Sequence, residues 1–389
     1  MTIKIYSAST TAPVNIATLK YWGKRDTRLN LPTNSSISVT LSQDDLRTLT
    51  TAAASSSFET DKLWLNGIEE SVHTPRLSAC LAELRQLRRQ HEQVHAELAP
   101  LSQYHLHIVS ENNFPTAAGL ASSAAGFAAL VRAVADLFEL PQSAEELSRI
   151  ARQGSGSACR SLLGGYVAWD KGDAADGSDS VARQVATKQH WPDLRAAVLV
   201  ISDAKKETSS TAGMQVTVAT STLFQHRVDV VVPARFEQMS AAIVAKDFET
   251  FGKLTIADSN QFHAVCLDSS PPIFYLNDYS RRAIAIIERL NAIYGRIVAA
   301  YTFDAGPNAV LYYQQKDEAI VLGLLKEALP DINGWKPSTA NIIPSFPEGI
   351  PKSLLDGLQA GVSRIILTSV GDEPQPTSKS LIGTDGLPK

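Results

Sequence analysis

A run of small residues stands directly before a long apolar segment, and this junction is the strongest chemical signal in the chain. Residues 112–126 read NNFPTAAGLASSAAG and lead into the mainly apolar run 120–138. Small residues let a backbone close around an anion, the first free N–H groups of a helix point toward it, and the helix dipole adds about half a positive charge. The junction therefore indicates a phosphate site, and a nucleotide is the usual occupant of such a site.

The same composition has a plainer explanation, because an alanine-rich apolar helix is also typical of a tightly packed core. Glycine and serine turns before helices are common, so the residues alone favour a phosphate loop and a packing device about equally. The chain contains no Gly-x-x-x-x-Gly-Lys-Ser/Thr pattern of the Walker A type. A nucleotide site at this junction would be of another kind.

Three further clusters carry charged or hydroxyl groups beside turn residues. Residues 15–25 (NIATLKYWGKR) combine two lysines, an arginine and two aromatic rings with a turn glycine. Residues 153–161 (QGSGSACRS) place hydroxyls around a glycine and before Arg160, and residues 301–309 (YTFDAGPNA) place Asp304 between a strand and a turn. Each cluster also has a structural interpretation: a solvated basic loop, a glycine-rich turn with a structural arginine, and a turn-forming aspartate.

One motif is misleading. Residues 91–95 (HEQVH) match the H-E-x-x-H pattern of zinc proteases, and helical spacing would put both histidines on one face. The motif lies in residues 83–97, a segment dense with Arg, Gln and Glu, and no convincing third ligand follows. A solvated helix explains it better than a metalloprotease site.

The elements that must position these clusters follow from hydrophobic periodicity and turn residues. The first half predicts strands at 3–6, 36–41, 46–51, 62–65, 105–110 and 165–169, and helices at 75–98, 120–138 and 144–153. The second half predicts strands at 196–201, 298–302, 309–313 and 365–368, and helices at 209–220, 228–246, 248–260, 277–294 and 316–329. Residues 171–180 predict a loop, and the proline-containing tail after Gly371 is expected to be extended or loosely docked.

Length and composition limit the classes of protein. A chain of 389 residues predicts two domains, 1–192 and 193–389, with the boundary near Pro192. The net charge of −4 gives no reason to expect nucleic acid or an anionic membrane as a partner, so any polyanion site must be local. The sequence has no signal segment or membrane-spanning run, which predicts a cytoplasmic protein with no membrane partner. Three cysteines without Cys-x-x-Cys spacing favour neither a disulfide framework nor a zinc knuckle.

The order of these motifs carries a resemblance. PTAAGLASSAA at 115–125 resembles the phosphate-binding motif of the GHMP small-molecule kinase superfamily, and NIATLKYWGKRD followed by LPTNSSISVTL resembles its mevalonate diphosphate decarboxylase branch. SGSACR at 155–160 is similar to the segment that cups the substrate in that branch. Asp304 stands where the related kinases carry a glycine-rich stretch and the decarboxylases carry an aspartate. Together with a weaker match at 205–214, the resemblance covers residues 9–310.

The resemblance implies an α+β two-domain GHMP-kinase-like fold: an N-terminal ribosomal-protein-S5-like α/β domain, a C-terminal α/β domain, and an active-site cleft between them. It implies that the chain converts (R)-mevalonate 5-diphosphate and ATP, with Mg²⁺, to isopentenyl diphosphate, ADP, phosphate and CO2. Phosphorylation of the 3-hydroxyl turns a poor leaving group into a good one. The resemblance also implies a homodimer in the mevalonate pathway of isoprenoid and sterol biosynthesis.

The same resemblance implies roles for individual residues. Lys20 and Asp304 would stand near the 3-hydroxyl, and Arg160 would pair with the substrate carboxylate in a fork-to-fork contact that lysine cannot reproduce. The remaining substrate-binding residues would be Tyr21, Trp22, Gly23, Lys24, Arg76, Ser155, Gly156, Ser157, Ala158, Cys159, Ser210 and Thr211. The ATP phosphates would lie against Ala118, Gly119, Leu120, Ala121, Ser122 and Ser123. No side chain is assigned to Mg²⁺, which ATP carries, although Ser123 is a candidate ligand.

Two other functions remain open from the sequence. A sister GHMP kinase would phosphorylate a related hydroxyl and stop, and a catalytically silent protein on the same scaffold would sense nucleotides and metabolites. The joint presence of Lys20, Arg160 and Asp304 argues against the sensor, which would not need all three.

Overall fold

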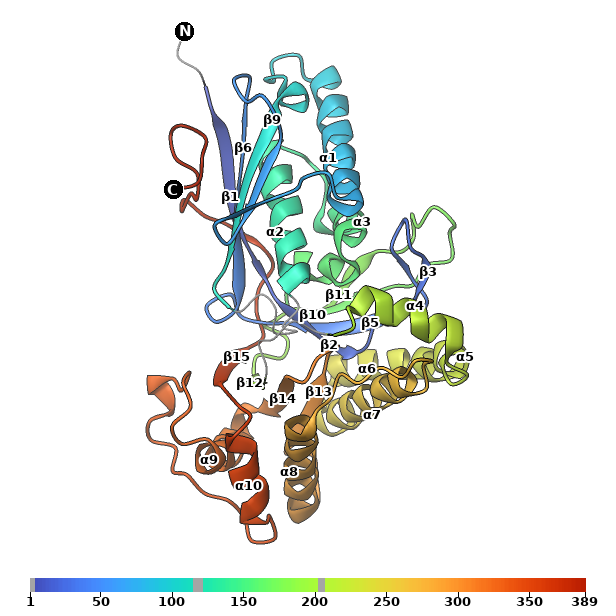
Figure 1. The fold of residues 1–389 in the computed structure, drawn as a ribbon, viewed down its shortest axis with the longest axis vertical. Coiled ribbons are helices and arrows are strands. Elements are labelled where there is room, and N and C mark those ends of the chain that lie inside the picture. The colour runs from blue at the N-terminus through green and yellow to red at the C-terminus, as the bar shows by residue number, and fades with distance from the viewer. Residues whose placement is uncertain (1–3, 115–121, 202–206) are drawn as a thin grey trace.

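The two halves of the chain form the two ends of an elongated molecule. The structure, a computed structural model, describes residues 4–114, 122–201 and 207–389. In Figure 1 the first half, blue to green, forms the upper end, and most of the second half, yellow to red, forms the lower end. Within these ranges no helix combines the length and apolar character needed to cross a bilayer.

A six-stranded sheet with helices on one face makes up the outer part of the first half (Figure 1). Its strands, in spatial order, are β16 (Gln375–Pro376), β1 (Tyr6–Pro13), β6 (Arg47–Ser55), β9 (His105–Asn112), β7 (Lys62–Leu65) and β8 (Ile68–Glu70). The helices are α1 (Pro75–Val94), α2 (Ser122–Leu137) and α3 (Ala144–Gly154). Ala52 of β6 and Ala128 of α2 are fully buried in the core between them, because methyl side chains let a helix approach a sheet closely.

Two four-stranded sheets, a small hairpin and seven α-helices make up most of the remaining regular structure in the described residues. The middle sheet has the order β11 (Ala182–Ala186), β10 (Tyr166–Trp169), β5 (Ser36–Thr40), β2 (Asn15–Leu19), and the other has the order β13 (Ala299–Phe303), β14 (Ala309–Gln314), β12 (Leu194–Val200), β15 (Arg364–Ser369). A small hairpin pairs β3 (Lys24–Asp26) with β4 (Leu31–Pro32). The helices are α4 (Ser210–Thr220), α5 (Phe224–His226), α6 (Val232–Ala245), α7 (Phe248–Leu267), α8 (Asp278–Tyr294), α9 (Glu318–Ala328) and α10 (Lys352–Gln359).

One hydrophobic core joins the two halves. The Phe251 ring packs edge-to-face on Trp191 and on Tyr312, with centroid distances of 5.5 and 5.8 Å. The Tyr312 hydroxyl, on β14, donates to the main-chain oxygen of Ile16 on β2 at 3.2 Å. Helix α7 contacts both β2 and β13. This packing brings the C-terminal end of β2, from the first half, near the end of β13, from the second.

The C-terminal tail returns to the first half. Beyond β15 the chain pairs β16 with β1, and Leu381 and Ile382 are buried in a small core with Trp64 of β7. The His107 ring, on β9, lies within hydrogen-bonding distance of the Gly386 oxygen, at 2.7 Å. The predicted extended tail is confirmed, but loose docking is wrong, because backbone pairing and apolar burial both hold it.

Most predicted elements are confirmed with small shifts of their ends, and the exceptions have physical causes. The strand predicted at 3–6 is misplaced: residue 3 lies outside the described residues, and β1 begins only at Tyr6. The sequence of β1, YSASTTAP, lacks the apolar alternation that marks a strand. Pairing with β6 along its whole length makes it one. The helix that begins at Phe248 extends seven residues beyond its predicted end. The elements that were not predicted from the sequence include the helix α10 and the strands β2, β3, β4, β8, β11 and β16.

Candidate functional site

A pocket of about 230 Å³ lies where the two halves meet, and its walls come from both. The structure brings most of the predicted site residues together in its lining: Lys20, Tyr21, Trp22, Lys24, Arg76, Ser122, Ser123, Ser155, Gly156, Ser157, Arg160, Ser210, Thr211 and Asp304. Residues far apart in sequence thus share one cavity.

Lys20 and Asp304 form an ion pair in this pocket. The Lys20 Nζ and Asp304 Oδ1 atoms are 2.7 Å apart, and the two side chains are 3% and 28% exposed. Lys20 follows β2 and Asp304 follows β13. Burial lowers the pKa of Lys20 from its ordinary value, and the charge of Asp304 partly offsets that effect. The shielded ammonium and the accessible carboxylate can together hold a hydroxyl group and accept its proton.

Arg160 places a buried guanidinium at the same pocket. It belongs to a 3-10 turn, Gly156–Leu162, and is 2% exposed. Its Nε atom is 3.2 Å from Asn15 Oδ1 and 3.0 Å from Ser38 Oγ, and its Nη1 atom is 2.5 Å from Ser36 Oγ. In the described part of the chain its hydrogen bonds go to neutral groups, and no carboxylate forms an ion pair with it. A buried cation without an anionic partner is suited to bind an anion.

The start of α2 brings two hydroxyls to the pocket. Ser122 and Ser123 are its first described residues, and Ser123 Oγ is 3.2 Å from Ser155 Oγ at the end of α3. Helix N-termini with nearby hydroxyls favour bound phosphate. The helix itself is largely buried, as the packing interpretation predicts. Ala118, Gly119, Leu120 and Ala121 lie outside the described residues, so their assignment to the nucleotide stays a prediction.

One side of the pocket, called here the basic wall, is lined by the basic side chains of Lys24 and Arg76 and by the hydroxyls of Tyr21 and Thr211. Arg76 Nη2, on α1, donates to Thr211 Oγ1, on α4, across 2.8 Å. Burial, together with the charge of Arg76, lowers the pKa of Lys24 to about 8. The buried Tyr21 hydroxyl has no hydrogen-bond partner among the described residues, and its ring packs edge-on against Trp169. Such a wall can take up the oxygens of a polyanion.

Three predicted site residues, Gly23, Ala158 and Cys159, lie outside the lining of the pocket. Gly23 has a φ of +87°, and a Cβ atom there would lie 2.5 Å from Phe224 Cζ, so this turn requires glycine. The Cys159 Sγ atom lies 3.0 Å from the Gly156 oxygen, and burial raises the pKa of the thiol to about 12. Such a thiol is not a nucleophile.

The H-E-x-x-H motif lies at the end of α1, away from the pocket lining. Glu92 accepts hydrogen bonds from Arg88 Nε at 2.8 Å and from the Ser102 main-chain nitrogen at 3.0 Å. The His91 and His95 rings pack against each other at 4.6 Å. Across the described ranges, no three His, Cys, Asp or Glu side chains gather in a way that could hold a metal. Glu92 fastens the helix to the turn that follows it.

Several residues of the site were not predicted from the sequence. Asn15 opens the NIATLKYWGKRD motif, yet its contact with Arg160 becomes visible only in the fold. Its Nδ2 atom donates to Ser161 Oγ at 2.7 Å, which ties β2 to the 3-10 turn. Met214 and Phe262 add an apolar part to the lining, and no local pattern distinguishes them from core residues.

Comparison with known proteins gives consistent matches along the chain. The model of a diphosphomevalonate decarboxylase-like N-terminal domain matches residues 12–182, and that of a mevalonate 5-diphosphate decarboxylase C-terminal domain matches residues 196–377. The diphosphomevalonate decarboxylase of Debaryomyces hansenii is 60% identical over 391 residues, which cover 99% of this chain and 98% of the relative.

Solved structures agree with these matches. The X-ray structure of a mevalonate 5-diphosphate decarboxylase has a TM-score of 0.93 and 59% identity, and the match covers 98% of this chain and 100% of that one. A structure of MDDEF in complex with MVAPP, AMPPCP and magnesium has a TM-score of 0.74 and 30% identity, with 97% and 100% coverage. The predicted two-domain, GHMP-like α/β fold is confirmed.

Proposed function

The chain belongs to the diphosphomevalonate decarboxylase family, and we propose that its pocket binds (R)-mevalonate 5-diphosphate beside Mg-ATP. It is a decarboxylase: the reaction converts mevalonate 5-diphosphate and ATP to isopentenyl diphosphate, ADP, phosphate and CO2.

The observation that carries this proposal is the meeting of two charged features in one cavity. The Lys20–Asp304 pair suits a hydroxyl, and the Arg160 guanidinium, without a carboxylate partner in the described residues, suits an acid group. A kinase that stops at phosphorylation needs the first feature and has no evident use for the second. A nucleotide sensor needs neither.

Asp304 and Lys20 act at the 3-hydroxyl. Bound Mg-ATP supplies the phosphoryl group that makes this oxygen a leaving group. The accessible Asp304 carboxylate orients the hydroxyl and takes its proton as the oxygen becomes a nucleophile. Lys20 keeps the carboxylate in place and counters negative charge on the reacting oxygen.

Arg160 acts on the carboxylate. Its buried guanidinium attracts the substrate carboxylate by charge and orients it through directional hydrogen bonds. Meanwhile the phosphorylated oxygen leaves with its bonding electrons. The carbon–carbon bond then breaks, its electron pair forms the new double bond, and CO2 departs. The hydroxyls of Ser36 and Ser38 and the amide oxygen of Asn15 keep the guanidinium plane in position.

The polyanionic parts of both substrates bind elsewhere in the pocket. Tyr21, Lys24, Arg76, Ser155, Ser157, Ser210 and Thr211 hold the diphosphate of mevalonate diphosphate. Ser122, Ser123 and the residues before α2 hold the ATP phosphates. Mg²⁺ prefers oxygen ligands and is usually carried by phosphates with one or two protein groups. The hydroxyls of Ser122 and Ser123 fit that donor set.

Three further features are part of the proposal. The two domains span residues 1–192 and 193–389. The chain forms a homodimer. It acts in the cytoplasm, in the synthesis of isoprenoids and sterols. Analytical ultracentrifugation tests the dimer, and fractionation of the source cells tests the location. A monomer at micromolar concentration would overturn the homodimer.

Direct product analysis tests the function. The protein is incubated with Mg-ATP and mevalonate diphosphate, and CO2, ADP, phosphate and isopentenyl diphosphate are measured together. We expect equal amounts of all four. ADP without CO2 would favour the plain kinase, and the absence of both would favour the sensor.

A further inference from the structure

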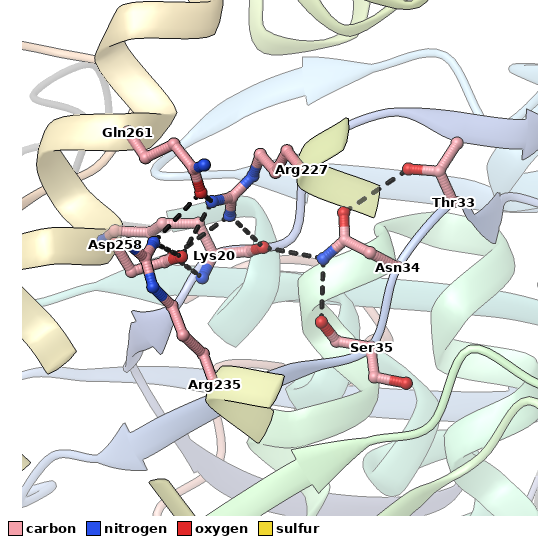
Figure 2. A network of polar contacts seen from close by, with 8 residues as sticks. All are labelled: Lys20, Thr33, Asn34, Ser35, Arg227, Arg235, Asp258 and Gln261. Atoms are coloured by element: carbon pink, nitrogen blue, oxygen red, sulfur yellow. Dashed lines mark hydrogen bonds and ion pairs between the residues drawn. The ribbon is translucent and has the colours of Figure 1, made fainter. Parts of the chain in front are cut away.

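The main chain of Lys20 is held by charged side chains from the other half of the molecule (Figure 2). Its nitrogen donates to Asp258 Oδ2 at 2.7 Å, and its oxygen accepts from Arg227 Nη2 at 3.2 Å. The Asn34 Nδ2 atom donates to the same oxygen at 2.9 Å. Both peptide groups beside the Lys20 Cα are therefore fixed. Asp258 and Arg227 were not predicted from the sequence, because neither lies near a motif.

Asp258 and Arg227 form a fully buried ion pair. Their side chains are 0% exposed, with Nη1–Oδ1 and Nη2–Oδ2 distances of 2.7 and 3.1 Å. Arg235 Nη1 also donates to Asp258 Oδ1 at 3.0 Å, and both arginines donate to Gln261 Oε1. Burial alone would raise the pKa of Asp258, but the two guanidinium groups hold it below its usual range.

An irregular helix places Arg227 in this network. The helical segment from Phe224 to Ala245 contains a π-helical turn, Arg227–Val231, before α6. Pro233 stands near the start of α6, and it cannot donate the hydrogen bond that a continuous α-helix would need there. Single π turns inside helices are frequent at functional sites. Here the turn begins at the residue whose guanidinium reaches the Lys20 oxygen.

A purely stabilising role does not explain this arrangement well. A buried ion pair contributes little net stability compared with apolar residues of the same size, because both charges must leave water. This pair instead ends on the N–H and C=O groups of one residue, and that residue carries the ammonium that contacts Asp304. Fixing both peptide groups fixes the direction of the Lys20 Cα–Cβ bond, from which the side chain extends to Asp304.

We propose that Asp258 and Arg227 are positioning residues that act through the main chain of Lys20, so that α7 and the π-helical turn set the geometry of the Lys20–Asp304 pair. This inference rests on the proposed function, because it assumes that the pair acts on the 3-hydroxyl. It adds a link from the helices of the second half to the reacting group.

Matched arginine variants give the first test. Arg227→Lys keeps the charge beside Asp258 but loses the fork that reaches the Lys20 oxygen, whereas Arg235→Lys alters the same carboxylate without touching Lys20. We expect Arg227→Lys to lower kcat at least about tenfold, with the KM values for ATP and mevalonate diphosphate changed less than about twofold, because misplacement of a reacting group lowers the chemical step. Arg235→Lys should stay within about twofold of wild type. Equal kcat values in the two variants would overturn the inference.

A pH profile gives the second test, which remains informative if Arg227→Lys folds poorly. Lys20 faces Asp304 after β13, Asp258 and His263 on α7, and Arg160 on the 3-10 turn. Burial lowers the pKa of His263 to about 3, so its ring stays neutral. Asp258, like Asp304, favours the charged form of Lys20. Asp258→Asn removes one of these charges, so Lys20 loses its proton at lower pH.

We therefore expect the alkaline limb of kcat, measured with saturating mevalonate diphosphate so that the binding contribution of Lys24 does not enter, to move to lower pH in Asp258→Asn. An unmoved limb, with a lower melting temperature alone, would mean a structural role and overturn the inference. If the wild-type protein releases no CO2, the proposed function fails and this inference with it. An active wild type with an unmoved limb and equal arginine variants would overturn this inference alone.

Discussion

Lys20 takes part in two charged arrangements: its ammonium pairs with Asp304 across the two halves, and its main chain is held by the Asp258–Arg227 pair of the second half. The two carboxylates differ in what they leave free. The Asp304 carboxylate is 28% exposed in the pocket, and within the described residues its side chain bonds to Lys20 alone. Asp258 is 0% exposed and accepts from two arginines and a main-chain nitrogen. The Asp304 carboxylate has acceptor positions left for a substrate, whereas the Asp258 carboxylate uses both of its oxygens in hydrogen bonds within the protein.

The difference shows that a carboxylate paired with a cation can serve either the chemistry of a pocket or the rigidity of the protein. A carboxylate that is fully hydrogen-bonded by its own protein is rigid and cannot accept a proton without breaking that network. A carboxylate with one partner and access to a pocket can exchange water for a hydroxyl. Arg160 is a third case, a buried cation whose hydrogen bonds within the described residues go to neutral groups, which suits it to bind an anion.

The most severe test of this comparison is Asp304→Asn. The amide matches the carboxylate in size but can neither accept the hydroxyl proton nor carry the charge opposite Lys20, so kcat should fall by about 10³ or more. Circular dichroism and ATP titration should match wild type. A variant that binds ATP normally and keeps a tenth of wild-type turnover would make Asp304 a structural turn residue.

A matched control for Asp304→Asn uses a carboxylate outside the pocket. Asp317 pairs with Arg296 at 2.6 Å and is 3% exposed. Asp317→Asn breaks a comparable ion pair and should lower the melting temperature, while kcat stays within about twofold of wild type. If both aspartate variants lost turnover equally, the distinction between pocket and structural carboxylates would fail.

A smaller effect is expected for Arg160→Lys. Lysine keeps the positive charge but loses the planar fork and its fixed contacts with Asn15, Ser36 and Ser38, so carboxylate alignment should suffer more than ATP binding. We expect kcat/KM for mevalonate diphosphate to fall about a hundredfold, with an unchanged dissociation constant for ATP. Full activity in this variant would remove the assigned role in clamping the acid group.

Substrate binding at the basic wall of the pocket should depend on pH through Lys24. The pKa of Lys24 is lowered to about 8 from an ordinary value of 10.5, so its ammonium is charged below that pH and neutral above it. At pH 9, kcat/KM for mevalonate diphosphate should be about tenfold lower than at pH 7. Lys24→Arg stays charged and should move this alkaline limb to higher pH. A limb at the same pH in both proteins would assign it to another group.

The smallest effect should come from the cap at the start of α3, at the opposite end of the helix from Ser155. Ser143 caps α3: its Oγ accepts from the Glu146 nitrogen at 3.2 Å, and Glu146 returns a contact to the Ser143 nitrogen at 2.8 Å. Ser143→Ala should lower the free energy of unfolding by about 1 kcal/mol, measured by urea denaturation. Turnover should remain within about twofold of wild type, although α3 leads directly to Ser155. A tenfold loss of kcat would show that the helix end is part of the catalytic machinery.

What the sequence determined by itself is local. The helices α2 and α3 are evident from apolar periodicity, and the motifs around Lys20, Arg160 and Asp304 are evident because each lies within about ten consecutive residues. The strands β1 and β2 were missed or misplaced because their small, hydroxylated side chains carry little intrinsic signal, and pairing with neighbouring strands decides their conformation.

The tertiary structure alone decided which of these local features meet. Lys20 and Asp304 are 284 residues apart, and only the packing of α7 against β2 and β13 brings them to 2.7 Å. The same packing puts Asp258 and Arg227 behind Lys20, although neither belongs to a recognisable motif. Contacts of this kind depend on how whole elements bury their apolar faces, so no window of neighbouring residues contains them.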